Sequence, residues 1–345
     1  MRTLVRKADS RVFFTWLVAL SPMLVPGCNE SLKSSNPGRF TSHSNPGRVE
    51  TLEPQATEII EQALADADPR IRANAVEVVA STRQINLMPK VQRLLTDDVV
   101  PVRFTAALAV GDTEYVLARK AVQRLLKDYD ENVRIAAAYA LGKLWVPQSF
   151  DVIRRAVNSK DQTIRANATM LVGKIGDRSD RELLFRTLRS PDSGDKVRLQ
   201  AVEAMARLGD KRAYARLWAM LISAFADDRA MGIAGMGALG TEEAKNALIT
   251  MLSDDVPEIR LAAAEHLGML GDRVGEAVVL DVFDKKLTAG LDRQDRERVN
   301  VRTALAMGRI GTDAVTEFLP GLLADESKFV RMAAAKAVFQ RTANK

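Results

Sequence analysis

The sequence predicts an all-α fold, a right-handed α-solenoid of about nine helical-hairpin repeats between residues 51 and 345. Three observations predict it: an arginine recurs at a nearly fixed period, the residue seven positions after it is apolar in every copy, and the residue three positions after it is alanine in seven copies. Such a period is typical of stacked helical repeats. The reference positions are Arg72, Arg103, Arg134, Arg165, Arg198, Arg229, Arg260, Asn300 and Arg331, with spacings of 31, 31, 31, 33, 31, 31, 40 and 31.

Each copy is predicted to be two helices joined by a turn rich in Asp and Pro, such as residues 243–252 followed by residues 258–270. In the second helix, the alanine and the apolar residue share one face, where a neighbouring helix can approach closely. Eleven positions after the reference residue, the fourth to eighth copies have glycine, which ends a helix well. These glycines are Gly176, Gly209, Gly240, Gly271 and Gly311.

The repeated pattern D-x-x-x-x-[VI]-R-x-x-A resembles the short HEAT-like repeats of phycobilin lyase-type proteins, over about residues 51–341. The resemblance implies the solenoid fold. It leaves the function open, because the same hairpin serves scaffolds, inhibitors and a few enzymes.

The recurring charges predict a structural ladder that locks repeat to repeat. An aspartate in the turn can cap the second helix, and the arginine one turn into that helix can pair with a carboxylate of its own or an adjacent repeat. The predicted ladder consists of Asp66, Asp97, Asp128, Asp192, Asp254 and Asp325 with Arg72, Arg103, Arg134, Arg165, Arg198, Arg260 and Arg331. The copies at Arg229 and Asn300 depart from the pattern and are expected to be looser.

The inner wall of the solenoid is the predicted binding surface. Positions two, five and nine after the reference residue lie opposite the apolar stripe of the second helix. In the middle copies they include Tyr139 and Met170, expected to be exposed apolar anchors, and a basic row of Lys143, Lys174 and Arg207 that would steer an acidic protein partner. The alternative is an ordinary solvated face with scattered apolar residues.

The amino terminus predicts export. A basic stretch precedes an apolar run of 14 residues, 12–25, which is shorter than the ~20 residues that span a bilayer. Val25-Pro26-Gly27-Cys28 resembles a bacterial lipobox, so residues 1–27 are predicted to be a signal peptide, Cys28 a lipidated residue and residues 28–50 a flexible tether. The expected location is the bacterial cell envelope, with the protein facing the periplasm or exterior and held by its lipid alone. An ordinary secretory signal or an uncleaved anchor is the alternative.

Composition argues against several functions. One cysteine and two histidines among 345 residues exclude a disulfide framework and a multi-histidine metal site, and no cofactor is expected. Of the net charge of +6, residues 1–50 carry +4, so the repeats lack the basic excess of a nucleic-acid-binding protein. Deoxyhypusine hydroxylase-type HEAT proteins hold two irons with several His-Glu pairs, whereas the repeats here contain only His266, preceded by Glu265.

The predicted function is therefore a membrane-tethered, extracytoplasmic scaffold that binds another protein through its inner wall. The alternative is a bilin or tetrapyrrole lyase-like enzyme, or another cofactor-processing enzyme. The 40-residue spacing places one insertion at residues 284–298, expected to be a mobile loop that either binds the partner or is neutral.

Overall fold

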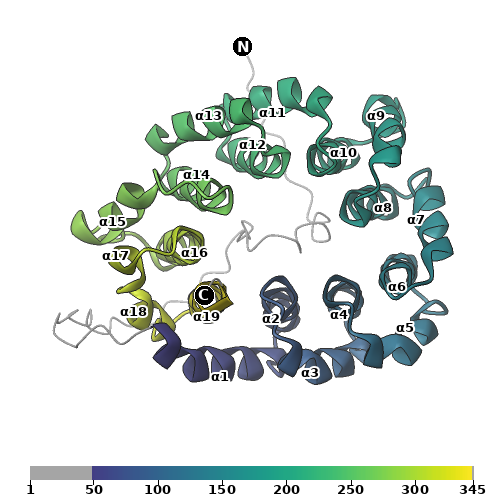
Figure 1. Cartoon of the computed structure of the whole chain (residues 1–345), viewed down its shortest axis with the longest axis horizontal. Helices are drawn as coiled ribbons and strands as arrows, with labels where there is room; N and C mark the ends of the chain where they lie inside the picture. Colours follow the sequence, from purple (N-terminus) through teal and green to yellow (C-terminus); the bar gives the residue numbers. More distant parts are fainter. Residues whose placement is uncertain (1–48, 344–345) are drawn as a thin grey trace, which may run out of the picture.

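The computed structural model describes residues 49–343, and within this range it contains helices, turns and no β-strand. The helices form nine hairpins arranged as a ring of two layers (Figure 1). We number the hairpins repeat 1 to repeat 9 along the chain. In each, an outer helix leads into an inner helix, so the prediction of an all-α solenoid is confirmed.

The inner layer is made of the second helices, which run parallel to one another around the ring (Figure 1). They are α2 (Pro69–Ser81), α4 (Val100–Thr113), α6 (Glu131–Lys143), α8 (Gln162–Ile175), α10 (Asp195–Arg207), α12 (Ala226–Leu239), α14 (Pro257–Met269), α16 (Arg293–Ile310) and α19 (Lys328–Ala343).

The outer layer is made of shorter helices, and the outer arm of repeat 9 is divided in two. They are α1 (Glu53–Leu64), α3 (Met88–Arg93), α5 (Arg119–Leu125), α7 (Phe150–Ala156), α9 (Arg181–Arg189), α11 (Tyr214–Leu221), α13 (Glu242–Thr250), α15 (Glu276–Asp284), α17 (Asp313–Thr316) and α18 (Leu319–Leu323). A 3-10 turn, η1 (Val49–Leu52), precedes α1.

Four of the inner helices, α2, α6, α8 and α16, begin at an aspartate that caps them. The Asp68 carboxylate accepts a hydrogen bond from the Arg70 amide at 2.8 Å, and Asp130 and Asp161 cap α6 and α8 in the same way. A cap of this kind stabilises a helix by about 1 kcal/mol, which explains why the helices start at these acidic turns.

The helices of the inner layer pack through the predicted stripe. The apolar residue seven positions after each reference residue is at most 3% exposed in all nine copies. The small residue at position three lets the layers approach: a Cβ on Gly232, which replaces alanine in repeat 6, would lie 3.0 Å from Leu221. The core is therefore a continuous band between the two layers, not one central cluster.

The solenoid closes on itself. Helix α19 of repeat 9 packs against α1 and α2 of repeat 1, as Figure 1 shows at the base of the ring. Two ion pairs cross this junction: Lys336 Nζ lies 3.0 Å from Glu77 Oε1, and Lys328 Nζ lies 2.5 Å from Asp66 Oδ2. The inner wall is thus the wall of a ring, where the sequence had indicated only a stack of repeats.

The insertion in repeat 8 is only partly a loop. Turns and irregular backbone follow α15 over residues 285–292, and residues 293–298 form the first turns of α16, which is 18 residues long. Arg298 pairs there with Glu258 of α14 at 3.4 Å. The expectation of a mobile loop throughout 284–298 is wrong for its second half, because these residues extend a helix that packs on its neighbour.

Candidate functional site

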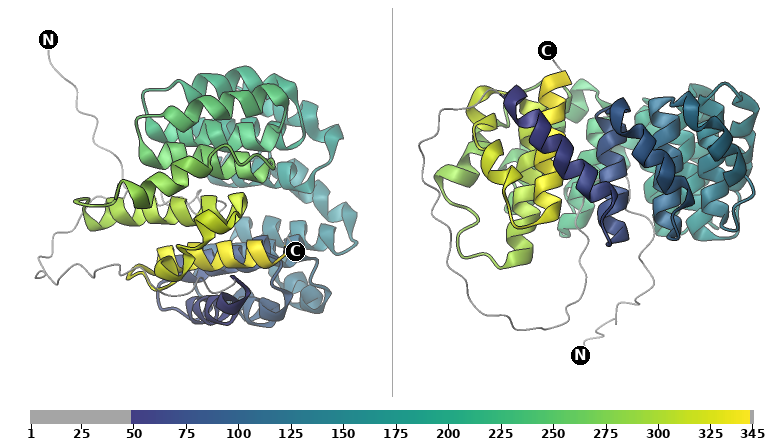
Figure 2. Two further views of the ribbon diagram at one scale, coloured as in Figure 1. Left: turned by 60° about the vertical axis from the view of Figure 1, so that its left-hand side comes forward. Right: turned by 90° about the horizontal axis from the view of Figure 1, so that it is seen from below.

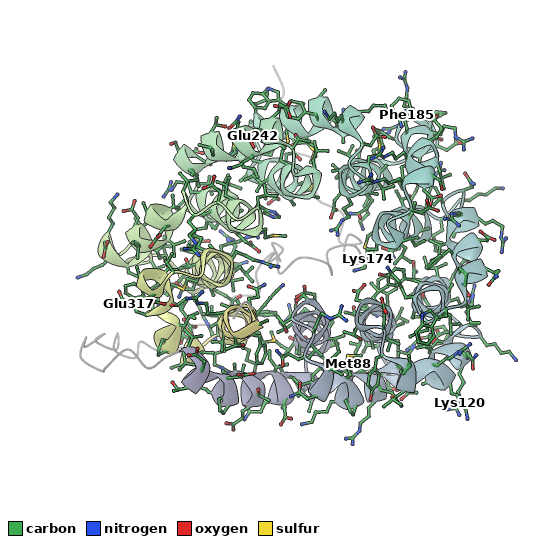
Figure 3. The ribbon with its side chains drawn as sticks, viewed as in Figure 1. Met88, Lys120, Lys174, Phe185, Glu242 and Glu317 are labelled. Carbon is green, nitrogen blue, oxygen red and sulfur yellow. The ribbon has the colours of Figure 1, made fainter. Side chains whose placement is uncertain are left out.

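A cavity of about 720 Å³ lies at the centre of the ring, and each of the nine inner helices contributes to its lining. Figure 3 shows the side chains that project toward this centre, Lys174 among them, whereas Lys120 lies on the outer layer. The inner-wall positions two, five and nine supply most of the lining. All five residues predicted for partner binding line this cavity: Tyr139, Lys143, Met170, Lys174 and Arg207.

Tyr139 and Met170 are not exposed anchors. They are 1% and 8% exposed, because the ring brings inner helices close enough to bury position five of α6 and α8. The prediction that these two residues present apolar surface is therefore wrong.

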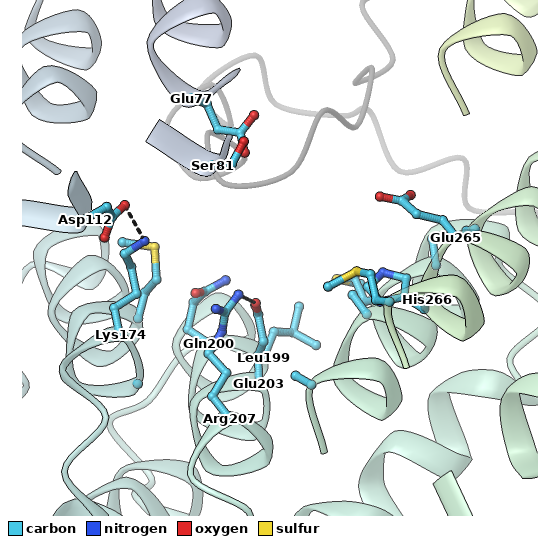
Figure 4. Close-up of a pocket in the computed structure, with 18 of the residues that line it drawn as sticks. Glu77, Ser81, Asp112, Lys174, Leu199, Gln200, Glu203, Arg207, Glu265 and His266 are labelled. Atoms are coloured by element: carbon cyan, nitrogen blue, oxygen red, sulfur yellow. Dashed lines mark hydrogen bonds and ion pairs between the residues drawn. The ribbon is translucent and has the colours of Figure 1, made fainter. Parts of the chain in front are cut away.

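Asp112 of α4 joins three successive inner helices. Its carboxylate accepts a hydrogen bond from the Tyr139 hydroxyl at 2.7 Å and pairs with Lys174 Nζ at 2.8 Å. Burial, together with the negative charge of Asp112, raises the pKa of the Tyr139 hydroxyl well above its ordinary value, so the phenol stays protonated. Lys174 is thus engaged within the wall, as the dashed line in Figure 4 shows.

Other charges of the wall are also paired within the ring, so the predicted basic row does not act as a row of free cations. Arg207 pairs with Glu203 on its own helix at 2.7 Å (Figure 4). Further pairs in the lining join Lys336 to Glu77 and Arg302 to Glu265.

Lys143 and Arg309 differ from these pairs. Among residues 49–343, Lys143 is half-buried at the cavity and has no carboxylate within ion-pair distance. Arg309 has no carboxylate within ion-pair distance among the same residues, and with the Gln340 amide turned so that its oxygen faces the guanidinium, Arg309 Nε and Nη2 donate to that oxygen at 3.2 Å. These two cations are available to an anionic group in the cavity.

An apolar sector occupies the side of the cavity formed by α10, α11, α12 and α14. On α12, small residues four apart face the cavity and leave room beside three methionines, whose flexible thioethers suit varied apolar surfaces. The sector contains Leu199, Leu217, Met220, Ala230, Met231, Ala234, Ala238 and Met269, the last of which is 47% exposed.

His266 lies at the edge of this sector, beside Glu265 (Figure 4). Its Nδ1 is buried without a hydrogen-bond partner, and a Cβ on Gly237 of α12 would lie 2.3 Å from it. Burial lowers the pKa of His266 below its ordinary value, so the imidazole is neutral at pH 7. In this geometry His266 packs closely against helix α12.

The predicted ladder exists in part, and its direction is specific: the arginines that pair with a turn aspartate do so in the following repeat. Arg72 Nε lies 2.8 Å from Asp97, and Arg103 Nε lies 2.9 Å from Asp128. The two copies expected to be looser keep the contact, since Arg229 pairs with Asp254 at 2.8 Å and Asn300 donates to Asp325 at 3.2 Å. At the ring junction, Lys328 takes the place of the arginine and pairs with Asp66.

The ladder prediction is wrong for the remaining arginines, because none of them pairs with a turn aspartate. The turns that follow Arg134, Arg165 and Arg198 have Ser159, Ser190 and Ser223 where other copies have aspartate, so no carboxylate can meet them there. Arg134 instead donates to the Asp128 carbonyl at 2.8 Å. Arg260 and Arg331 make the equivalent bond to the carbonyls of Asp254 and Asp325.

Asp192 also lies outside the ladder. The 33-residue spacing adds two residues to this turn, which moves the capping role to Ser190 and leaves the Asp192 side chain exposed. Counting six residues back from Arg198 therefore identified the wrong turn residue.

Two further findings concern the predicted anchor and metal chemistry. Cys28 and the other residues before 49 lie outside the described residues. Within 49–343, no helix is long and apolar enough to cross a bilayer, and no cluster of three or more His, Cys, Asp or Glu side chains could hold a metal ion.

Comparisons with known proteins concern the repeats. A family model described as HEAT repeats matches residues 92–164, 118–206, 152–230 and 217–286. No curated protein sequence matches the chain significantly.

Several solved structures are similar at low identity. The CpcE–CpcF complex of phycocyanin lyase from Nostoc sp. PCC7120 is 18% identical, with 80% of this chain and 100% of that chain covered and a TM-score of 0.44. Human deoxyhypusine hydroxylase in complex with glycerol is 20% identical, with 77% and 99% covered and a TM-score of 0.35. Importin beta is 13% identical, with 84% and 47% covered and a TM-score of 0.36.

Proposed function

Because the chain belongs to the family of HEAT-repeat proteins, whose solenoids commonly bind other proteins, we propose that it is a membrane-tethered scaffold that binds a protein segment at the centre of its ring. The observation that carries the proposal is the central cavity to which all nine inner helices contribute. The scaffold is proposed to act in the bacterial cell envelope, held through a lipid on Cys28.

The size of the cavity limits what can bind there. A volume of about 720 Å³ lies in the range of pockets that hold small molecules or single peptide segments, and it is too small for a folded domain. Since α19 closes the ring against α1 and α2, the wall cannot open without breaking that junction. The proposed occupant is therefore a slender segment, such as a loop or a terminus of the partner.

The lining indicates the chemistry of that segment. The methionines and alanines of the apolar sector would contact apolar side chains, and Lys143 and Arg309 would pair with carboxylates. An acidic segment with apolar residues fits the apolar sector and the two cations. The proposed partner is therefore still acidic, but of the predicted basic row only Lys143 is proposed to pair with it.

Site-specific crosslinking tests the proposal. A photoreactive phenylalanine at Met231, which faces the cavity, should crosslink the partner in native membranes. The same group at Ala219, exposed on the outer helix α11, should not. Lys143→Glu should weaken capture at Met231 at least tenfold while leaving the unfolding midpoint close to that of the parent. Crosslinking from Ala219 alone would place the partner on the outer layer and contradict the proposal.

The tether is tested separately at Cys28. Cys28→Ser should give a chain without acyl groups that leaves the membrane fraction or keeps an unprocessed signal. If the variant is processed and fractionates as the parent does, a plain secretory signal or a retained helix replaces the lipid anchor.

A second candidate, a tetrapyrrole-binding or other cofactor-processing activity, is favoured by one observation. The cavity has the volume of a cofactor site, and its two cations without carboxylate partners could bind the propionates of a tetrapyrrole. A shifted absorption spectrum of added bilin, lost in Lys143→Glu, would support this candidate. An unchanged spectrum would argue against this candidate and favour the scaffold function.

A further inference from the structure

The ring has two rims. At one, which we call the connection rim, each inner helix ends and the next outer helix begins; at the other, the turn rim, each outer helix ends and its inner helix begins. The right-hand view of Figure 2 shows the ring from the side, with the start of α1 and the end of α19 at the same rim. This is the connection rim.

The connection rim carries exposed apolar side chains in the three connections that join repeats 1 to 4, and the turn rim carries others, with Tyr129, Ile222 and Phe225 at 77%, 69% and 72% exposed. Trp145 is 74% exposed and Leu117 is 73% exposed, and Ile85 and Val116 are each 45% exposed. The inner helices before these connections, α2, α4 and α6, are packed side by side. The four side chains therefore form a neighbouring group on one rim.

The backbone at these connections is strained, whereas the equivalent backbone of later repeats is not. Position eleven is left-handed in eight copies: Gly176, Gly209, Gly240, Gly271 and Gly311 occupy it in the later ones, and Arg83, Glu114 and Trp145, with φ of 52°, 53° and 67°, in the first three. A tryptophan in this conformation is rare, because its Cβ crowds the following carbonyl. Side chains are thus held on this part of the rim at a cost in folding stability.

The apolar group of the connection rim is bordered by charged side chains. Arg83, Arg119 and Lys120 are exposed cations beside it, and Glu114 and Asp151 are exposed carboxylates. The turn rim carries both signs of charge, with the exposed cations Arg70, Lys127 and Lys160 beside the exposed carboxylates Asp98, Asp161, Asp192, Asp195, Asp227, Asp255 and Glu326. The three cations of the connection rim can meet the phosphates of an anionic surface.

The described chain also begins at the connection rim. Val49 of η1 precedes α1 there, and η1 contacts α19. Twenty residues separate Val49 from Cys28, so a lipid on that cysteine would be attached to the rim that carries the tryptophan and the cations.

We infer that the connection rim of repeats 1 to 4 docks on the surface of an anionic phospholipid bilayer, with Trp145 and Leu117 in the headgroup region and Arg83, Arg119 and Lys120 at the phosphates. The inference extends the proposed anchoring, and it adds an orientation: the ring stands on its connection rim, with the turn rim directed away from the membrane. Tryptophan suits such an interface because its ring is apolar and its N–H is polar.

Tryptophan fluorescence can test this orientation on the full chain. The sequence has three tryptophans, Trp16, Trp145 and Trp218, and Trp218 lies on the outer helix α11. With Trp16→Phe in every variant, Trp218→Phe leaves Trp145 as the reporter, and Trp145→Phe leaves Trp218 as its matched control. Each is reconstituted on vesicles of phosphatidylcholine and phosphatidylglycerol, with and without brominated acyl chains.

We expect brominated lipid to reduce Trp145 emission to about half and to leave Trp218 emission nearly unchanged. A pair of leucines at the two ends of α5 gives a second comparison. Leu117→Asp, on the connection rim, should remove the quenching of Trp145, and Leu126→Asp, on the turn rim and 42% exposed, should not.

Flotation of the same vesicles separates this inference from the proposed anchor. Protein that floats with unquenched Trp145 overturns the docking and keeps the anchor. Protein that does not float stably but shows quenched Trp145 with excess vesicles overturns the anchor and keeps the docking. Protein that neither floats nor shows quenched Trp145 overturns both the anchor and the docking. Equal quenching of Trp145 and Trp218 overturns the docking alone.

Discussion

Removal of the Arg103 guanidinium should destabilise the ring more than removal of Arg134, although both belong to the same repeated position. Arg103 donates through Nε and Nη2 to the two oxygens of Asp128, at 2.9 and 3.0 Å, and both side chains are 7% exposed. Its Nη1 also donates to the Asp97 carbonyl at 2.7 Å. Truncation to alanine leaves the Asp128 carboxylate buried, with the Asp130 amide as its remaining donor.

The structure gives the size of the effect. Breaking a buried ion pair by removing one partner costs about 3–5 kcal/mol, because the other charge stays desolvated. We expect Arg103→Ala to lower the free energy of unfolding by about 3 kcal/mol or more. Arg134 makes the same carbonyl bond, but its side chain is 37% exposed and its ion pair is with Glu131 of its own helix at 3.6 Å, so Arg134→Ala should cost about 1 kcal/mol.

A double-mutant cycle in urea separates pairing from packing. Arg103 and Asp128 should show a coupling energy of about 2 kcal/mol, and Arg134 and Asp128 a coupling near zero. Unfolding is followed by both far-UV circular dichroism and tryptophan fluorescence, since coincident transitions are required before energies are compared. Equal couplings in the two cycles would refute the assignment of each arginine to the following repeat.

Three further outcomes are expected. Trp145→Gly should raise the free energy of unfolding by up to about 1 kcal/mol, because glycine relieves the left-handed strain and Trp145 is mostly exposed; urea melts will show a loss instead if its ring packs on the protein. Glu77→Ala should leave Lys336 without its partner at the ring junction and increase the radius of gyration in small-angle scattering, whereas an unchanged radius would mean that α1 and α19 hold the ring without the pair. Since burial lowers the pKa of folded His266, the unfolded chain binds the proton first, and stability should fall as the pH decreases through about 6.5; His266→Asn should lack this slope between pH 7 and 5.5.

The fold was predictable because the residues that recur at the repeat period are those that must be buried in the core. Position seven is apolar and position three is small in every copy but one, and these residues form the core between the layers. The resemblance to HEAT-like repeats is confirmed by the family match, and the prediction of nine hairpins agrees with the helices of residues 49–343. Closure was not predictable, because it depends on the small rotation between successive repeats, which accumulates around the ring and leaves no pattern in any single copy.

The sequence predicted which positions of the inner helices line the site, but it did not predict how exposed their side chains are or which residues they pair with. Extending position nine to every copy would have found Asp112, Met269 and Arg309, all of which line the cavity. The exposure of Tyr139 and Met170 was misjudged because an open concave wall was assumed, and a closed ring crowds the same positions. The ion-pair partners of Lys174 and Arg207 were missed. Asp112, the partner of Lys174, lies two repeats earlier, and Glu203, the partner of Arg207, lies on the same face of the same helix.

Ring closure also constrains how this chain can change over evolution. An open solenoid can gain or lose a repeat at an end, since only one interface is altered and a terminal repeat caps the core. Here the ends of the repeat array meet, and repeat 9 takes the place of a cap for repeat 1 through Lys336 and Lys328. Adding or deleting a hairpin would leave those contacts without partners, so the repeat number is fixed by geometry, and new length can be accommodated only within a repeat. The insertion in repeat 8, which lengthens the turn before α16 and α16 itself, follows that rule.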